Sequence, residues 1–233
     1  MKAVRETVSF VDVESEKMLH QGLMPLVDGA GFFGEETGKS GSQDLVWIVD
    51  PIDGTTNYLS GLDAFCVSIA LVENGEPILG VVYKPNSDEV YASTKGQGVL
   101  YNGAITKPAL PDIATSDALF FTGFPYRSPD VADQFFTAAA EILTLGRGIR
   151  RSGSAALDVA NLSLGWLQGF WETDLQPYDV AAGILMMKEN GVLVTNGKGE
   201  PYDMFSDRLM VAALPNVHPA LLNAVQNAYI ELS

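Results

Sequence analysis

Hydrophobic residues follow two spacings along this chain, one typical of strands and the other typical of helices. Short apolar runs rich in β-branched and aromatic residues predict strands at 30–34, 45–49, 65–72, 77–83, 90–91, 119–122, 148–150, 166–171 and 209–213. Helical spacing, or runs between capping signals, predicts helices at 13–27, 131–145, 155–164, 177–189 and 219–230. The pattern therefore predicts a mixed α/β protein.

The order of these elements differs between two parts of the chain. Residues 65–101 contain strands only, and Asn74-Gly75 marks a tight hairpin, so an antiparallel meander is expected there. Beyond a proline-containing connection at 108–111, strands and helices alternate. With 233 residues, of which 47% are hydrophobic, the chain can bury a sizeable core. We expect one unit, 1–233, with halves at about 1–110 and 111–233.

A turn at residues 50–57 directly follows the apolar strand at 45–49. It carries Asp50 and Asp53, with the Ile52 carbonyl between them, and its glycine at position 54 allows a tight bend. Two carboxylates and a carbonyl that face one small space are hard oxygen ligands, which suit Mg2+ or Mn2+. The alternative is an Asx turn, in which the acids hydrogen-bond only their own backbone.

Three further acids stand beside predicted elements. Glu35 follows a strand, Asp179 lies in the first turn of a helix, and Asp12 is expected to be the N-cap of the helix at 13–27. A structural role is an alternative for Asp179, because an acid in a first turn offsets the helix dipole by about 0.3 to 1 kcal/mol. Open α/β folds place ligands at strand ends and helix starts. One cluster is therefore predicted from Glu35, Asp50, Asp53 and Asp179.

Several other chemistries are disfavoured. Segment 34–40 looks like a phosphate-binding loop, but three residues rather than four separate its glycines, and two of them are glutamates. Cys66 is expected to be a small buried hydrophobe, because position 72 lacks the arginine of a cysteine phosphatase. His20 and His218 both lie away from every motif. We therefore expect neither thiol nor histidine catalysis.

Charge and composition narrow the choice of partners. The formal net charge is -15, from 29 acids and 14 bases, which argues against nucleic acid and against an anionic membrane. No apolar run approaches the length of a membrane span, and one cysteine cannot form an internal disulfide. A cytoplasmic protein is the expectation.

Four motifs give the chain a resemblance to the inositol monophosphatase family, the lithium-sensitive metal-dependent phosphatases. They are GEE at 34–36, WIVDPIDGTTNY at 47–58, GSAA at 153–156 and PYDVAAG at 177–183. The resemblance extends from about Val8 to the C-terminus. It implies a layered α-β-α-β-α sandwich of the sugar-phosphatase type that forms a single catalytic unit, usually as a homodimer.

The resemblance also implies roles for individual residues. Two to three Mg2+ ions, replaceable by Mn2+, would bind to Glu35, Asp50, Asp53, Asp179 and the Ile52 carbonyl. The residues implied in catalysis are Glu35, Asp53 and Thr55, of which Thr55 would position the attacking water. The residues implied in substrate binding are Asp53, Gly54, Thr55, Gly153, Ser154, Ala155, Glu172 and Asp179. Lithium would inhibit by replacing a weakly held Mg2+.

This sequence departs from the family pattern at two places. The family begins with a long helix, whereas seven residues precede Val8 here, so a shortened or absent N-terminal helix is expected. Tyr178 stands where tryptophan is usual, which keeps an aromatic wall.

The expected reaction is hydrolysis of a phosphate monoester by water that the metals activate. Inositol 1-phosphate, or a related small polyol or sugar phosphate, is the favoured substrate. Alternatives are fructose-1,6-bisphosphatase or histidinol-phosphatase activity. A different class of answer is a cation-dependent inositol-phosphate-binding protein that has lost catalysis.

Overall fold

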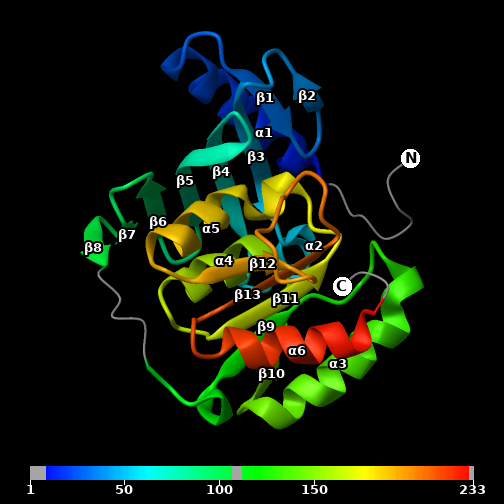
Figure 1. Cartoon of the computed structure of the whole chain (residues 1–233). Coiled ribbons are helices and arrows are strands. Elements are labelled where there is room, and N and C mark those ends of the chain that lie inside the picture. The colour runs from blue at the N-terminus through cyan, green and yellow to red at the C-terminus, as the bar shows by residue number, and fades with distance from the viewer. Residues whose placement is uncertain (1–8, 107–111, 231–233) are drawn as a thin grey trace.

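Two β-sheets stack between layers of helices (Figure 1). The computed structural model describes residues 9–106 and 112–230. Helix α1 (Phe10–Leu23) covers one sheet, α4 (Ala155–Ser163) and α5 (Pro177–Glu189) lie between the sheets, and α3 (Ala132–Leu145) and α6 (His218–Ala228) cover the other sheet. This order is the predicted α-β-α-β-α sandwich.

The first sheet has eight strands in the order β2-β1-β3-β4-β5-β6-β7-β8. Their bounds are β1 (Gly31–Gly34), β2 (Gly38–Ser40), β3 (Leu45–Asp53), β4 (Cys66–Glu73), β5 (Glu76–Lys84), β6 (Glu89–Thr94), β7 (Val99–Tyr101) and β8 (Ala104–Thr106). Strands β4 to β7 form the predicted antiparallel meander, with Asn74 and Gly75 at the β4–β5 turn, and antiparallel pairing also joins β3 to β4 and β8 to β7. Strand β1 pairs with β3 in parallel.

The second sheet has five strands in the order β10-β9-β11-β13-β12. Their bounds are β9 (Leu119–Thr122), β10 (Gly148–Arg150), β11 (Gly169–Thr173), β12 (Leu193–Asn196) and β13 (Leu209–Ala213). Strand β12 was not predicted. The prediction that β11 begins at residue 166 is wrong, because Trp166 lies before the strand and makes edge-to-face contacts with Tyr91 and Tyr101.

Helix boundaries correct one capping prediction. Asp12 is not the N-cap of α1: Ser9 is, and Asp12 lies three residues inside the helix. The two residues form a capping box, in which the Asp12 backbone N–H donates to Ser9 Oγ over 3.3 Å while the Ser9 N–H donates to Asp12 Oδ2 over 2.7 Å. A 3-10 turn (Met24–Leu26) follows α1, so the predicted helix at 13–27 is displaced toward the N-terminus.

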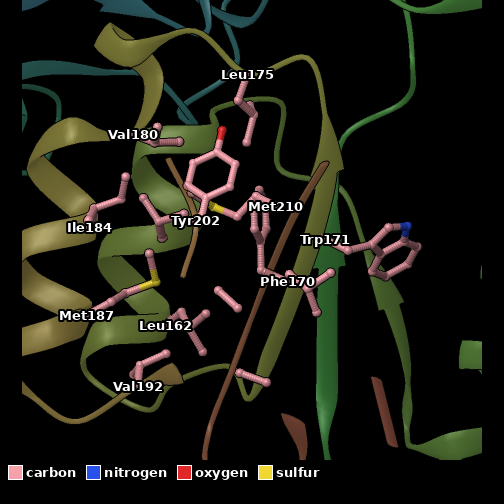
Figure 2. Packing of buried hydrophobic residues seen from close by; sticks show 14 of the residues in the cluster. Leu162, Phe170, Trp171, Leu175, Val180, Ile184, Met187, Val192, Tyr202 and Met210 are labelled. Carbon is pink, nitrogen blue, oxygen red and sulfur yellow. The ribbon is translucent and has the colours of Figure 1, made fainter. Parts of the chain in front are cut away.

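The largest hydrophobic cluster packs the helices between the sheets against both sheets and the outer helices against the second sheet. Figure 2 shows Leu162 of α4 and Met187 of α5 facing Phe170 and Met210. Trp171, the next residue along β11, points to the opposite face, where its ring stacks on Phe135 of α3 at 6.1 Å between centroids. Alternation along β11 therefore holds both helical layers against one sheet.

Some predictions fall outside the described residues. The connection at 108–111 and the segment before Val8 are among these, so the expectation of a shortened or absent N-terminal helix stays a prediction. Cys66 is buried, as expected. Within 9–106 and 112–230, no helix has the length and apolar character needed to cross a membrane.

Candidate metal and substrate site

One cavity of about 190 Å³ lies where the two sheets approach each other. Its wall includes all the predicted metal-binding, catalytic and substrate-binding residues: Glu35, Asp50, Ile52, Asp53, Gly54, Thr55, Gly153, Ser154, Ala155, Glu172 and Asp179. These residues come from β1, β3, α2 (Thr55–Leu59), α4, β11 and α5 and from the turns beside them. Both halves of the chain therefore build the site.

The two aspartates of the turn lie inside β3, which continues to Asp53 instead of ending at residue 49. Residues three positions apart in a regular strand point to opposite faces. Here the pairing with β4 is irregular: Asp50 lies opposite Ser68 and Asp53 lies opposite Cys66, so three residues of β3 advance against two of β4. This β-bulge lets both carboxylates reach one cavity.

Three carboxylates meet in the cavity. Asp50, Asp53 and Asp179 each offer an oxygen within 4.8 Å of the others, although Asp179 lies on a different layer. Asp50 is 2% exposed, and burial, followed by the charges of Asp53 and Glu35, holds the pKa of its carboxyl well above the usual value. Glu35 lines the same cavity but is not one of the three that approach so closely.

Asp53 joins the two halves of the chain. Its Oδ2 accepts hydrogen bonds from Ser154 Oγ and from the Ala156 backbone N–H, both at 2.6 Å. Ser154 is the N-cap of α4, so the same residue starts the helix and holds the carboxylate. Burial, followed by the charge of Asp179, raises the pKa of Asp53 to about 7 even though these donors favour the charged form.

Asp12, which the sequence predicts only as a helix cap, lies next to Thr55. The Thr55 hydroxyl lies 2.9 Å from Asp12 Oδ1 and 3.0 Å from the Ile52 carbonyl oxygen. Asp12 is fully buried, and its other oxygen is held by Ser9. The capping box therefore fixes one end of Asp12 so that the other end reaches Thr55, a contact 43 positions away that no local signal shows.

Helix α1 also holds the turn that carries Glu35. The buried carboxylate of Glu16 accepts the backbone N–H groups of Glu36 and Thr37 at 2.8 and 2.9 Å. It lies directly against Gly34, where a Cβ would come within 2.4 Å of it. Sequence reasoning missed Glu16, although its spacing of four from Asp12 places both acids on one face of a helix.

The C-terminal half adds an arginine that was not predicted. Arg127 Nη1 lies 2.7 Å from Asp179 Oδ2, and the same oxygen accepts the Gln176 backbone N–H at 2.7 Å. The nearby carboxylate of Asp179 raises the pKa of Arg127, so the guanidinium is charged at every relevant pH. Arg127 follows β9 in a segment without regular structure, which explains why no periodic pattern revealed it.

Two further acids form the wall opposite the turn. The Glu172 carboxylate lies over Gly123, where a Cβ would come within 2.0 Å of it. Burial, followed by the charge of Asp158, raises the pKa of Glu172 well above its usual value. Asp158, which was not predicted, is 2% exposed, and burial likewise raises its pKa.

Two glycines allow the backbone to close around the cavity. Gly54 has φ +94°, and a Cβ there would come within 2.8 Å of the Ala64 carbonyl. Gly153 has φ +91°, and its Cβ would meet the Asn57 amide at 2.8 Å. That amide donates to the carbonyls of Ala64 and Ser152 at 2.6 and 2.9 Å, which fastens α2 to the turn before α4.

The donor set fits a divalent cation. The Asp50, Asp53 and Asp179 carboxylates and the Ile52 carbonyl are hard oxygens, as Mg2+ and Mn2+ prefer. Burial, followed by mutual repulsion, raises the pKa of Asp50 and of Asp53, and a bound cation would offset the repulsion.

The layered sandwich with an acidic cavity between its sheets defines an enzyme of the phosphatase class. More narrowly, a model of the inositol monophosphatase family matches residues 2–229, so the chain belongs to this family.

Individual relatives are similar to this chain over most of its length. The inositol-1-monophosphatase of Mesorhizobium japonicum is 36% identical over 228 residues, which cover 97% of this chain and 85% of that protein. The Nus factor SuhB of Xylella fastidiosa is 36% identical over 208 residues, covering 89% of this chain and 75% of that protein. The structure of an inositol monophosphatase from Anabaena (Nostoc) sp. PCC 7120 superimposes with a TM-score of 0.87 at 35% identity, covering 93% of this chain and 86% of that one.

Proposed function

We propose that this chain is a Mg2+-dependent phosphomonoesterase that hydrolyses inositol 1-phosphate or a related small polyol or sugar phosphate. The observation that carries the proposal is the meeting of Asp50, Asp53 and Asp179 within 4.8 Å in one cavity. We further propose that the enzyme acts in the cytoplasm as a homodimer.

In this proposal the metal ligands are Asp50, Asp53, Asp179, Glu35 and the Ile52 carbonyl. When bound, Mg2+ supplies charge stabilisation for the phosphate and lowers the pKa of the attacking water. Two to three ions are proposed, with Mn2+ as a substitute and Li+ as an inhibitor. The acids alone would repel a phosphate dianion, which is why the reaction requires the cation.

The chain's own residues would orient the reactants. The Thr55 hydroxyl, when it donates to Asp12, keeps its lone pairs for a proton of the attacking water. The backbone of Gly54 and Thr55, at the start of α2, would contact the phosphate. Ser154, Ala155 and Glu172 stand on the wall that would face the ring hydroxyls.

The decisive experiment is phosphate release from a panel of inositol, sugar and nucleotide phosphates, with Mg2+ and with EDTA. We expect release from inositol 1-phosphate in Mg2+ and none in EDTA. Faster release from fructose 1,6-bisphosphate or histidinol phosphate would select those alternatives. No release from any ester would favour a binding protein that has lost catalysis. A titration with millimolar Li+ tests the expected inhibition, and a flat response would contradict it.

A further inference from the structure

Arg127 brings a positive charge to one of the candidate metal ligands. Its Nη1 lies 2.7 Å from Asp179 Oδ2. The Gln176 backbone N–H occupies a second direction at that oxygen, also at 2.7 Å. An oxygen that accepts two such donors has little room left for a metal ion, so a cation that binds this oxygen must displace one of the donors.

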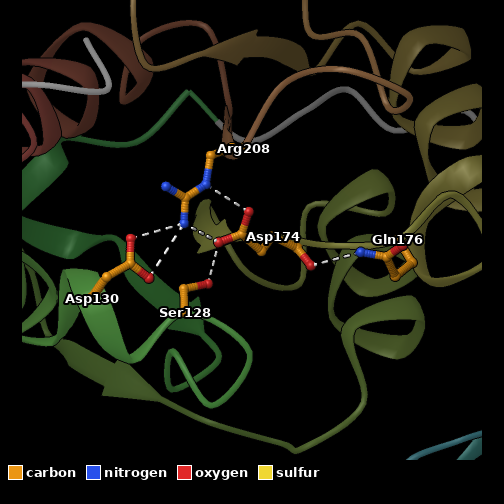
Figure 3. Close-up of polar contacts among 5 residues, drawn as sticks. All are labelled: Ser128, Asp130, Asp174, Gln176 and Arg208. Atoms are coloured by element: carbon orange, nitrogen blue, oxygen red, sulfur yellow. Dashed lines mark hydrogen bonds and ion pairs between the residues drawn. The ribbon is translucent and has the colours of Figure 1, made fainter. Parts of the chain in front are cut away.

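The segment around Arg127 is anchored by its neighbours (Figure 3). Ser128 Oγ hydrogen-bonds to Asp174 Oδ2, and Asp130 pairs with Arg208 Nη2 at 3.2 Å. Arg208 in turn reaches both oxygens of Asp174, at 2.9 Å from Nε and 2.7 Å from Nη2. Residues on the C-terminal side of Arg127 are therefore tied to the turn between β11 and α5, which also carries Gln176.

The charge of the cavity explains why an arginine lies there. Six carboxyl groups line it, on Glu35, Asp50, Asp53, Asp158, Glu172 and Asp179, against the two guanidinium groups of Arg127 and Arg151. The Arg151 guanidinium lies over the rings of Tyr126 and Phe124, at 5.3 and 5.7 Å from their centroids. Arg127 is thus the arginine that offsets the charge of Asp179, which is 3% exposed.

We propose that Arg127 is an exchangeable counter-ion: its guanidinium pairs with Asp179 in the metal-free protein and leaves when a divalent cation takes that carboxylate. Arg127 is then a positioning residue that sets the affinity of the cation. The inference rests on the proposed metal site and goes beyond it, because it assigns a competitor for one ligand to this chain itself.

The Arg127 guanidinium has access to solvent. The Arg127 side chain is 32% exposed, whereas that of Asp179 is 4% exposed, so Arg127 can turn toward solvent while Asp179 stays in place. The anchors at Ser128 and Asp130 keep the released side chain near the cavity mouth. The cation must replace an ion pair and not merely water, which weakens its net binding.

The test is isothermal titration calorimetry of the full chain with Mn2+ after treatment with EDTA. The variants are Arg127→Gln, which removes the competing charge, and Arg127→Lys, which keeps it. Arg147→Gln is the matched control, because Arg147 pairs with Asp117 at 2.7 Å on an exposed surface and does not line the cavity. We expect Arg127→Gln to bind Mn2+ about tenfold more tightly than wild type, and the other two variants to bind like wild type.

A second readout follows Arg127 in the wild-type protein and does not depend on any variant folding. The ¹⁵N side-chain NMR signal of Arg127 should shift when Mg2+ is added, whereas that of Arg147 should not. An unchanged Arg127 signal at saturating Mg2+ would overturn the exchange, and so would Mn2+ binding by Arg127→Gln that is equal to or weaker than that of wild type. Either result would leave the proposed function standing. Absence of divalent binding in every variant would overturn both.

Discussion

The two halves of the chain build the cavity in different ways. The N-terminal half supplies Asp50, Asp53 and Thr55 from one stretch of six residues. The C-terminal half supplies Arg127, Ser154, Glu172 and Asp179 from four separate places along the chain. In the N-terminal stretch, covalent connection and the β-bulge in β3 set the positions of the side chains. The positions of the scattered C-terminal residues depend instead on how the helical and sheet layers pack.

The difference has a consequence for each half. In the proposed function the N-terminal acids would bind the metal, yet Asp53 is oriented by Ser154 and Ala156 of the other half. The C-terminal wall would face the substrate, yet the separation of Asp179 from the turn is set by the packing of α5 on the first sheet. Variants of the proposed metal ligands, including Asp179, should therefore lose turnover, whereas variants of the wall that would face the ring hydroxyls should lose substrate discrimination.

The largest effect is expected from Asp53→Asn. The variant should fold and lose roughly 100- to 1000-fold in kcat, since it replaces a charged metal ligand with a neutral group of the same shape. Steady-state kinetics at saturating Mg2+ measure the loss, and circular dichroism checks the fold. Near-normal turnover would remove Asp53 from the metal site.

A smaller effect is expected from Asp12→Asn, which weakens the charged acceptor of the Thr55 hydroxyl. We expect kcat to fall about 10- to 100-fold with the Mg2+ dependence unchanged, because Asp12 orients Thr55 and lies outside the carboxylate cluster. Glu14→Gln is the control on the same helix, where Glu14 forms an exposed pair with Lys17. Equal losses in the two variants would show that α1 acts only through stability.

Glu172→Gln tests the C-terminal wall. Replacing the carboxyl group with an amide should cost about 1 to 3 kcal/mol in kcat/KM for a polyol phosphate, because one of the two oxygens available to the substrate hydroxyls becomes an NH2 donor. Hydrolysis of p-nitrophenyl phosphate, which has no ring hydroxyls, should barely change. Equal losses on both substrates would place Glu172 in the metal scaffold, and no loss on either would make it a structural acid.

The smallest effect concerns pH and stability without metal. The pKa of Asp53 is raised from 3.8 to about 7 in the folded protein, so the folded state holds a proton that the unfolded state has lost. The free energy of unfolding should therefore fall as pH rises from about 4 through 7, and raised pKa values at Asp50, Asp158 and Glu172 act in the same direction. Urea unfolding in EDTA at several pH values measures this. The slope should flatten in Asp53→Asn, and a stability that rises with pH would contradict it.

Most of the helices and strands could be predicted from the hydrophobic pattern and the turn signals of the sequence alone. The meander from β4 to β6 and the start of α5 at Pro177 appeared as predicted, because hairpin and first-turn signals are local. Trp166 misled the prediction of β11, since a large apolar residue next to a strand has the composition of the strand itself. Asp12 was placed in the wrong cap position because Ser9 three residues earlier offers the same kind of side chain.

For the site, the sequence by itself determined which acids are available and which stand at strand ends and helix starts. It could not determine that Asp50 and Asp53 face the same way, because a strand of regular pleat would separate them and only the pairing with β4 introduces the bulge. It also could not show that Thr55 contacts Asp12, or that Arg127 pairs with an acid 52 positions away. Side chains distant in sequence meet only when packed layers bring them together, so the tertiary structure alone decided those contacts.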